Sequence, residues 1–210
     1  IFRFPPARKL DSDPSLTNLV PELILNLMKR SYLHIRKKQF AEAIHDWQYV
    51  LELDPTNTRA KCNLIYTYIS LGYAYVQHGL VKQAIDLWEK ALQMNPDNID
   101  LMHNLALATE SIGQKSISQK YWREVIKRWK SQLKADPDNE YLKNCLVQVH
   151  KHFGGKALDS ESVEEKKAAI EEYREILKIN PDDFDAQFQI AQTLMEVETL
   201  ERSYHRTAET

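Results

Sequence analysis

The chain has 210 residues, of which 28% are charged and 43% hydrophobic, and its formal net charge is −2 at pH 7. This composition is typical of a folded chain with a substantial core, and the near-neutral charge gives no general attraction to polyanions. No run of apolar residues is long enough to cross a bilayer, so we expect no membrane span. The chain starts without Met and lacks a signal-peptide pattern, which predicts an excised or processed piece. We expect an intracellular, cytoplasmic location.

After an extended lead-in over residues 1–20, the sequence alternates between amphipathic segments and short breaks. The pattern predicts paired helices at 22–37 with 40–53, 58–78 with 81–94, 99–112 with 115–134, and 140–153 with 164–179. A further helix is predicted over 184–198 without a partner, and residues 199–210 form a C-terminal tail. With five glycines in all, the chain has little material for β-hairpins, and we expect an all-α fold.

Four prolines separate the predicted helix pairs at intervals of 41, 41 and 44 residues, at Pro55, Pro96, Pro137 and Pro181. Proline lacks an N–H group and clashes with the preceding turn, so each one ends a helix. A side chain two residues later is placed to cap the next helix: Asn57, Asn98, Asn139 or Asp183. Such a period indicates stacked two-helix repeats that share one elongated core.

Each predicted second helix carries a bulky aromatic residue on its apolar face. Three of them, Trp47, Trp88 and Tyr173, lie eight residues before a proline, with an alanine four residues earlier. Trp122 follows Trp88 at a spacing of 34 residues. We expect these four rings to be buried at equivalent places in successive repeats.

The segment LGYAYVQHGLVKQAIDLWEKALQMNPDN at 71–98 closely resembles the core of a tetratricopeptide repeat (TPR). The related copies extend the resemblance over about residues 22–197. It implies a right-handed α-solenoid of antiparallel helix pairs over 21–198, with four pairs and a terminal helix. It also implies a role in binding proteins rather than in catalysis.

Two helices are longer than the resemblance requires, each by about two turns. The additions are TRAKCNL at 58–64 and a lengthened second helix through KRWKSQLKA at 127–135. In the TPR fold both would project from one edge of the slab, forming a rim that contacts a partner or packs on other parts of the chain. Its predicted side chains are Arg59, Lys61, Trp129, Lys130 and Lys134. A third irregularity, GGKALDSES at 154–162, is predicted to be a loop that begins where Gly154 and Gly155 stop a helix.

Catalytic and metal-binding patterns are missing from the sequence. His150 and His152 are two residues apart on one predicted helix and point in different directions, and the acidic cluster after Pro181 fits a helix start better than a calcium loop. No nucleotide-binding or nucleophile motif is present. We therefore expect no enzymatic activity, metal or cofactor. Cys62 and Cys145 lie in different repeats and are expected to be reduced, partly buried thiols.

The resemblance to TPR proteins implies that the first helices of successive repeats line a groove for a partner. Transferring that pattern by position gives ten groove residues: Met28, Tyr32, Tyr66, Ile69, Tyr73, Gln77, His103, Leu107, Asn144 and Gln148. Tyrosine suits an interface because it joins a large apolar area to one hydrogen-bonding group. Some of these side chains would instead pack between repeats, which is the structural alternative for each of them.

Two further features define the expected partner. Chaperone-binding TPR domains hold a C-terminal carboxylate with Lys and Asn, but Met28 and Tyr32 stand at the equivalent places, so no such clamp is expected. A basic stripe on the helix at 115–134 would attract an acidic partner or nucleic acid, or would pair with the acidic segment at 164–175. Its members are Lys120, Arg123, Lys127, Lys130 and Lys134.

Taken together, the sequence predicts a scaffold or adaptor that binds a partner protein or peptide, with self-association through an exposed end repeat as the runner-up. The alternatives from other classes are a regulatory or substrate-recruiting segment of a larger enzyme and a helical-repeat nucleic-acid binder. The mixed, aromatic character of the predicted groove makes nucleic acid the less favoured ligand.

Overall fold

The computed structural model describes the backbone of residues 19–208 and the side chains of residues 19–203. Within this range every regular element is an α-helix. The chain divides into two compact units, one ending at Val125 and the other beginning at Ile126. The first described helix begins at Val20, and most of the predicted lead-in lies outside the described residues.

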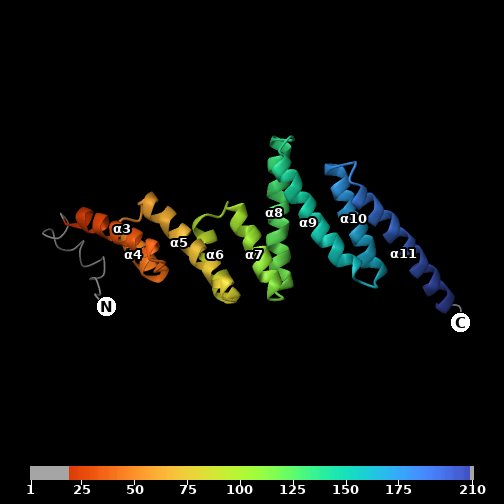
Figure 1. Cartoon of the computed structure of the whole chain (residues 1–210), viewed down its shortest axis with the longest axis horizontal. Helices are drawn as coiled ribbons and strands as arrows, with labels where there is room; N and C mark the ends of the chain where they lie inside the picture. Colours follow the sequence, from red (N-terminus) through yellow and green to blue (C-terminus); the bar gives the residue numbers. More distant parts are fainter. Residues whose placement is uncertain (1–18, 209–210) are drawn as a thin grey trace. The chain divides into compact units, whose positions relative to one another are not determined.

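Unit 1 is built from helix pairs that follow one another along the chain (Figure 1). Helix α3 packs on α4, α4 on α5, α5 on α6, and α6 on α7. The bounds are α3 (Val20–Arg36), α4 (Phe40–Leu53), α5 (Thr58–Gln77), α6 (Val81–Met94), α7 (Ile99–Ser111) and α8 (Lys115–Ala135), whose first half belongs to this unit.

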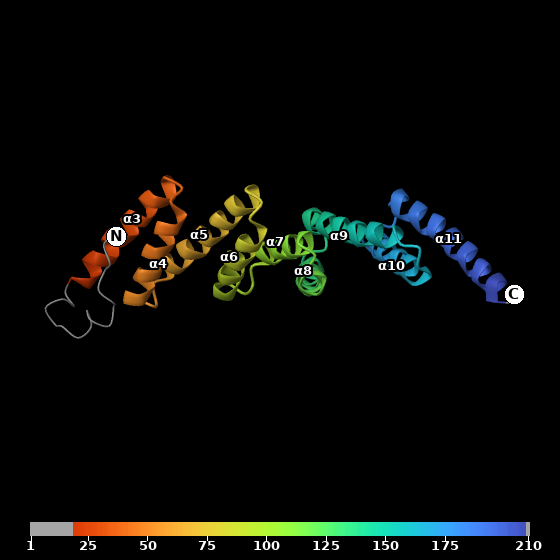
Figure 2. The same cartoon turned by 90° about the horizontal axis from the view of Figure 1, so that it is seen from below.

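Unit 2 contains the second half of α8 and three further helices. They are α9 (Glu140–Leu158), α10 (Val163–Ile179) and α11 (Phe184–Ala208). Helix α10 packs against both α9 and α11, and Figure 2 shows these three helices from a second side. Within the described residues, α11 is the last helix and has no second helix packed on it as α9 has.

The helix starts after the prolines are capped as the sequence predicts. The Asn57 side chain accepts a hydrogen bond from the Ala60 N–H at 3.0 Å, and Asn98 accepts one from the Leu101 N–H at 2.9 Å. Asn139 and Asp183 cap α9 and α11 in the same way. Each side chain satisfies an N–H group that the first turn of a helix leaves open, which fixes where the helix begins.

The aromatic residues of the second helices form the core, as predicted. Trp47, Trp88, Trp122 and Tyr173 are all buried, on α4, α6, α8 and α10 respectively. The first helix of a pair approaches its ring closely: a Cβ atom on Gly72 would lie 2.1 Å from Trp88 Nε1. Only a residue without a side chain leaves room for the indole at that point.

Two helix ends differ from the sequence expectation. Helix α9 continues through Gly154 and Gly155 to Leu158, so the predicted loop at 154–162 shrinks to the residues between α9 and α10. Gly154 is buried against the second helix, where a Cβ atom would lie 2.8 Å from Tyr173 Cε2. The glycine therefore serves helix packing rather than helix termination. Helix α11 runs on to Ala208, which makes most of the predicted tail helical.

Other expectations are met in part. Helices α5 and α8 have 20 and 21 residues against 13 in α7, so both long helices exist as predicted. Cys62 and Cys145 are free thiols, but Cys62 is exposed rather than partly buried. Of the helices that the structure describes, none combines the length and the apolar character needed to cross a bilayer.

Candidate partner-binding surface

The first helices of unit 1 expose a series of apolar and aromatic side chains. Tyr32 is 42% exposed, Tyr66 59% and Tyr73 46%, although each lies beside a fully packed core. We call six of the exposed side chains on α3, α5 and α7 the first-helix surface: Leu25, Tyr32, Tyr66, Tyr73, Val76 and Leu107. Large exposed apolar side chains on successive first helices are typical of protein-interaction surfaces.

Two of the tyrosines are fixed by the tryptophans beneath them. The ring of Tyr32 meets Trp47 edge-on with 5.2 Å between centroids, and Tyr73 meets Trp88 in the same way at 5.3 Å. Edge-to-face contacts stabilise an aromatic pair beyond the area it buries. The outer faces of the two tyrosines are thus held in defined positions above the core.

Hydrogen bonds between neighbouring first helices fix the tyrosine hydroxyls. Asn63 Nδ2 donates to Tyr32 Oη at 2.9 Å, joining α5 to α3, and Asn104 Nδ2 donates to Tyr73 Oη at 2.6 Å, joining α7 to α5. In both pairs the asparagine lies 31 residues after the tyrosine. This repeated pair was not predicted, because the two residues are distant in sequence; their equal separation is the signal that would have revealed it.

The remaining predicted residues of unit 1 divide by exposure. Gln77 and Leu107 are exposed, Ile69 is half-buried, and Met28 is buried in the core, 9% exposed. Met28 is therefore a correction: the side chain belongs to the packing of α3 and is not available to a partner. The structure supports the alternative of packing between repeats for this residue.

The His103 side chain also packs against the core and is only partly accessible to a partner. Its ring meets Trp122 at 5.1 Å between centroids, and burial lowers the pKa of its imidazole, an effect that nearby Asp100 partly opposes. The lowered pKa keeps the ring uncharged at neutral pH. His103 thus contributes to the packing of α7 on α8, and the first-helix surface reaches α7 through Leu107.

The predicted groove residues of unit 2 are described separately. Asn144 and Gln148 are both exposed on α9, one helical turn apart. Their amide groups can donate and accept hydrogen bonds. Whether they extend the first-helix surface of unit 1 stays a prediction.

The predicted rim residues are exposed with one exception. Arg59 and Lys61 are exposed at the start of α5, and Lys130 and Lys134 are exposed on α8. Trp129 is a correction, because it is only 5% exposed and cannot be reached by a partner. It lies seven residues after Trp122 on the same face of α8 and continues the buried stripe.

Part of the basic stripe pairs with the acidic helix, as the structural alternative proposed. Lys130 on α8 forms an ion pair with Glu175 on α10, and Lys178 pairs with the same carboxylate. Hydrogen bonds from two lysines lower the pKa of Glu175 to about 2, and the bond from Lys130 contributes more than the bond from Lys178. This carboxylate ties the second half of α8 to α10.

The lowered pKa gives a pH-dependent contribution to stability. A carboxylate whose pKa is lower in the folded state stabilises it above the unfolded pKa, and this contribution is lost as the pH falls toward the folded pKa. The Glu175 side chain is 29% exposed, so solvent screens its charge. We therefore expect a smaller effect on stability than the pKa shift alone would give. Urea unfolding should show Glu175→Gln less stable than wild type by about 1–2 kcal/mol at neutral pH. The difference should disappear near pH 2, and a gap that is constant with pH would contradict the assignment.

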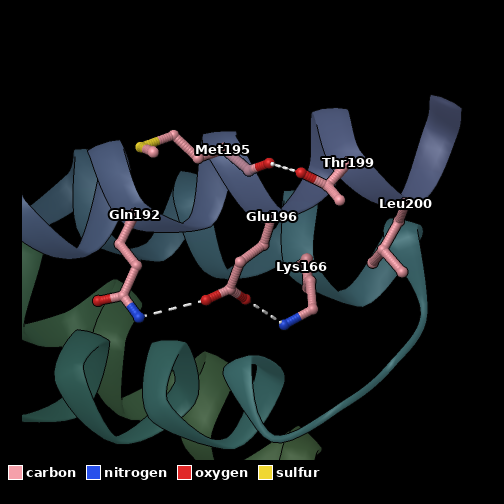
Figure 3. Close-up of a pocket in the computed structure, with 6 residues that line it drawn as sticks. All are labelled: Lys166, Gln192, Met195, Glu196, Thr199 and Leu200. Atoms are coloured by element: carbon pink, nitrogen blue, oxygen red, sulfur yellow. Dashed lines mark hydrogen bonds and ion pairs between the residues drawn. The ribbon is translucent and has the colours of Figure 1, made fainter.

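A shallow depression of about 410 Å³ lies between α10 and α11 in unit 2 (Figure 3). Lys166 Nζ donates to Glu196 at 2.6 Å, and Gln192 Nε2 donates to the same carboxylate at 3.2 Å. The remaining lining residues are Met195, Thr199 and Leu200. Among the described residues, no cluster of His, Cys, Asp and Glu is arranged to hold a metal ion.

The fold places the chain in the class of all-α helical-repeat proteins. Residues 72–113 match the family model of the TPR repeat, a range that includes the end of α5 and all of α6 and α7. The resemblance to the tetratricopeptide repeat family is thereby confirmed for this segment, which is a TPR repeat. Comparison of the sequence with curated proteins gives no match.

Solved structures with a similar fold include TPR proteins of low sequence identity. A crystal structure of MamA is 20% identical, covers 90% of this chain and 92% of its own, and has a TM-score of 0.41. A tetratricopeptide repeat protein from Parabacteroides merdae is 16% identical over 88% of this chain and 62% of its own, with a TM-score of 0.43. The C-terminal part of a TPR repeat-containing protein from Cytophaga hutchinsonii is 14% identical over 80% and 73%, with a TM-score of 0.46.

Proposed function

We propose that this protein is an interaction scaffold that binds a segment of a partner protein on the first-helix surface. The observation that carries the proposal is the pair of exposed tyrosines Tyr32 on α3 and Tyr73 on α5, each held by a tryptophan below it and an asparagine beside it. Side chains that are already fixed lose little conformational freedom when a partner binds. Tyrosine loses less than long aliphatic or charged residues because it has only two rotatable angles.

The chemistry of the surface suggests the kind of segment it accepts. Apolar rings alternate with polar groups that keep hydrogen-bonding capacity, since each tyrosine hydroxyl that accepts from asparagine can still donate its proton outward. A peptide with apolar side chains and accessible backbone carbonyl groups fits this pattern. The lack of a lysine–asparagine clamp at Met28 and Tyr32 argues against a carboxyl terminus as the main determinant.

The other functions fit less well. Lys130, one member of the basic stripe, is engaged by Glu175, and the first-helix surface is aromatic rather than basic, so nucleic acid has less support as a ligand. A non-catalytic role agrees with the presence of a TPR repeat. If the chain is a segment of a larger enzyme, the same surface would recruit a substrate protein. A cytoplasmic location stays part of the proposal.

The decisive experiment compares peptide binding by wild type and the double variant Tyr66→Ala with Tyr73→Ala. Peptides selected from a displayed random library on the wild-type chain would be measured by fluorescence anisotropy. Loss of two aromatic contacts should weaken binding by about 2–4 kcal/mol, or roughly 30-fold to 1,000-fold. Equal affinity of the variant for every selected peptide would refute the proposal.

Two further variants separate binding from folding. Ile117→Ala removes a side chain of similar exposure on the second helix α8, away from the first-helix surface, and should leave binding unchanged. Tyr73→Phe keeps the ring on Trp88 but removes the hydroxyl that accepts from Asn104. It should retain most of the affinity, because the ring supplies most of the buried area. Circular dichroism would confirm that all variants keep the helical fold.

A further inference from the structure

Helix α11 carries large apolar side chains that are exposed rather than packed against other described residues. Phe184 is 81% exposed, Phe188 63% and Met195 69%. With the exposed Ala191 they lie at steps of four, three and four residues, which places them on one face of the helix. We call this set of four residues the α11 stripe.

Helix α7 is the first helix of a complete repeat, and its residues at the matching positions show what packs on this face there. Both helices begin three residues after their proline, so positions can be matched directly. At the places of Phe188, Ala191 and Met195, helix α7 carries His103, Ala106 and Glu110.

These three residues of α7 form the seat of the second helix. The His103 ring meets the Trp122 ring edge-on, Glu110 accepts a hydrogen bond from Trp122 Nε1 at 3.1 Å, and Ala106 is fully buried. The α11 stripe is therefore the face on which a second helix would pack. In α11 the seat is lined by apolar groups instead of a hydrogen-bond acceptor.

We propose that the helix seated on the α11 stripe is α11 of a second copy of this chain, packed antiparallel about a two-fold axis near Ala191. This inference is independent of the first-helix surface. The direction agrees with the fold, because consecutive helices joined by short turns run antiparallel and a second helix would run the same way. In a two-fold contact the same surface must serve both partners.

The order of residues along the stripe meets this requirement. A two-fold axis near Ala191 places Phe188 of each copy against Met195 of the other, and thioether–aromatic contacts are favourable. The small Ala191 lies where the helices cross and allows a close approach. Phe184 then lies beside Thr199 of the other copy, at the border of the depression in Figure 3.

Charge also favours an antiparallel second copy. No ionisable residue belongs to the α11 stripe itself, so two copies meet there without like charges opposed. Beyond it, the exposed Asp182 of one copy lies near Arg202 of the other, whose side chain is 73% exposed and bound to Glu198 of its own helix. A parallel arrangement would instead place each of these groups beside its own equivalent.

Sedimentation equilibrium tests the proposal on the whole chain. The stripe is small for an interface, so we expect a dimer with a dissociation constant on the order of micromolar. The mass should rise from 24.6 kDa toward twice that value with concentration. Phe188→Glu and, separately, Met195→Glu should weaken dimerisation at least about tenfold. Both side chains are exposed, so the helical content and thermal midpoint should change little.

Controls distinguish this contact from others. The Tyr66→Ala, Tyr73→Ala double variant should dimerise like wild type, and Phe188→Glu should bind peptides like wild type, so the two proposals fail separately. In a Cys62→Ser, Cys145→Ser background, Ala191→Cys should form an intermolecular disulfide under mild oxidation, whereas Gln189→Cys, on the other side of α11, should not. A mass of 24.6 kDa at every concentration overturns the proposal and leaves the stripe to a helix of another protein. A dimer that survives both stripe variants overturns it as well.

Discussion

Replacing Gly72 by alanine should lower the free energy of unfolding by about 2–3 kcal/mol, although alanine favours helix by about 1 kcal/mol over glycine. The added methyl group would lie 2.1 Å from Trp88 Nε1 and 2.6 Å from Trp88 Cδ1, well inside contact distance. The indole cannot move aside, because Trp88 is buried and its Nε1 donates to the Ile69 carbonyl at 3.2 Å. The helices α5 and α6 must separate instead.

The chain supplies its own control for this experiment. Gly155 lies inside α9 with nothing within 4 Å of an added Cβ atom, so Gly155→Ala should be neutral or stabilising by up to about 1 kcal/mol. Gly154→Ala should fall between the two, since its methyl group would meet the edge of the Tyr173 ring at 2.8 Å. Urea unfolding followed by circular dichroism would rank the three variants. A Gly72→Ala variant as stable as wild type would show that the helix pair adjusts its packing at little cost.

Local rules predicted the helix boundaries that depend on neighbouring residues. The capping asparagines were assigned correctly because a side chain such as Asn57 acts on the first turn of its own helix. Trp47, Trp88 and Trp122 were assigned to the core correctly because an apolar stripe with helical spacing needs no knowledge of its partner. The boundaries between successive helix pairs followed from the proline period, and the helices within each pair from their apolar stripes.

Features that depend on contact between helices were missed or misassigned. Gly154 looked like a helix stop, and only the ring of Tyr173 on the next helix explains a glycine there. Met28 was transferred to the groove by position, but whether a side chain is covered depends on how closely its neighbours pack. Trp129 could have been assigned to the core, since it continues the stripe of Trp122 by two turns.

The tryptophans at equivalent places differ in one respect that stability measurements can detect. Trp47 is fully buried, and its Nε1 has no acceptor among the described residues, whereas Trp88 Nε1 donates to the Ile69 carbonyl. A buried N–H group without a partner costs about 1–3 kcal/mol, so part of the stabilisation that Trp47 provides is offset.

Trp47→Ala should lower the free energy of unfolding by about 3–5 kcal/mol, because it empties the largest fully buried site in the core of unit 1 and removes the support of Tyr32. Trp47→Phe should cost less than Trp88→Phe by about 1 kcal/mol, since both lose similar volume but only the second loses a hydrogen bond. Both comparisons can be made by urea unfolding at one pH. If the two phenylalanine variants lose the same stability, the indole N–H of Trp47 is satisfied in solution and the proposed asymmetry between the first two repeats does not exist.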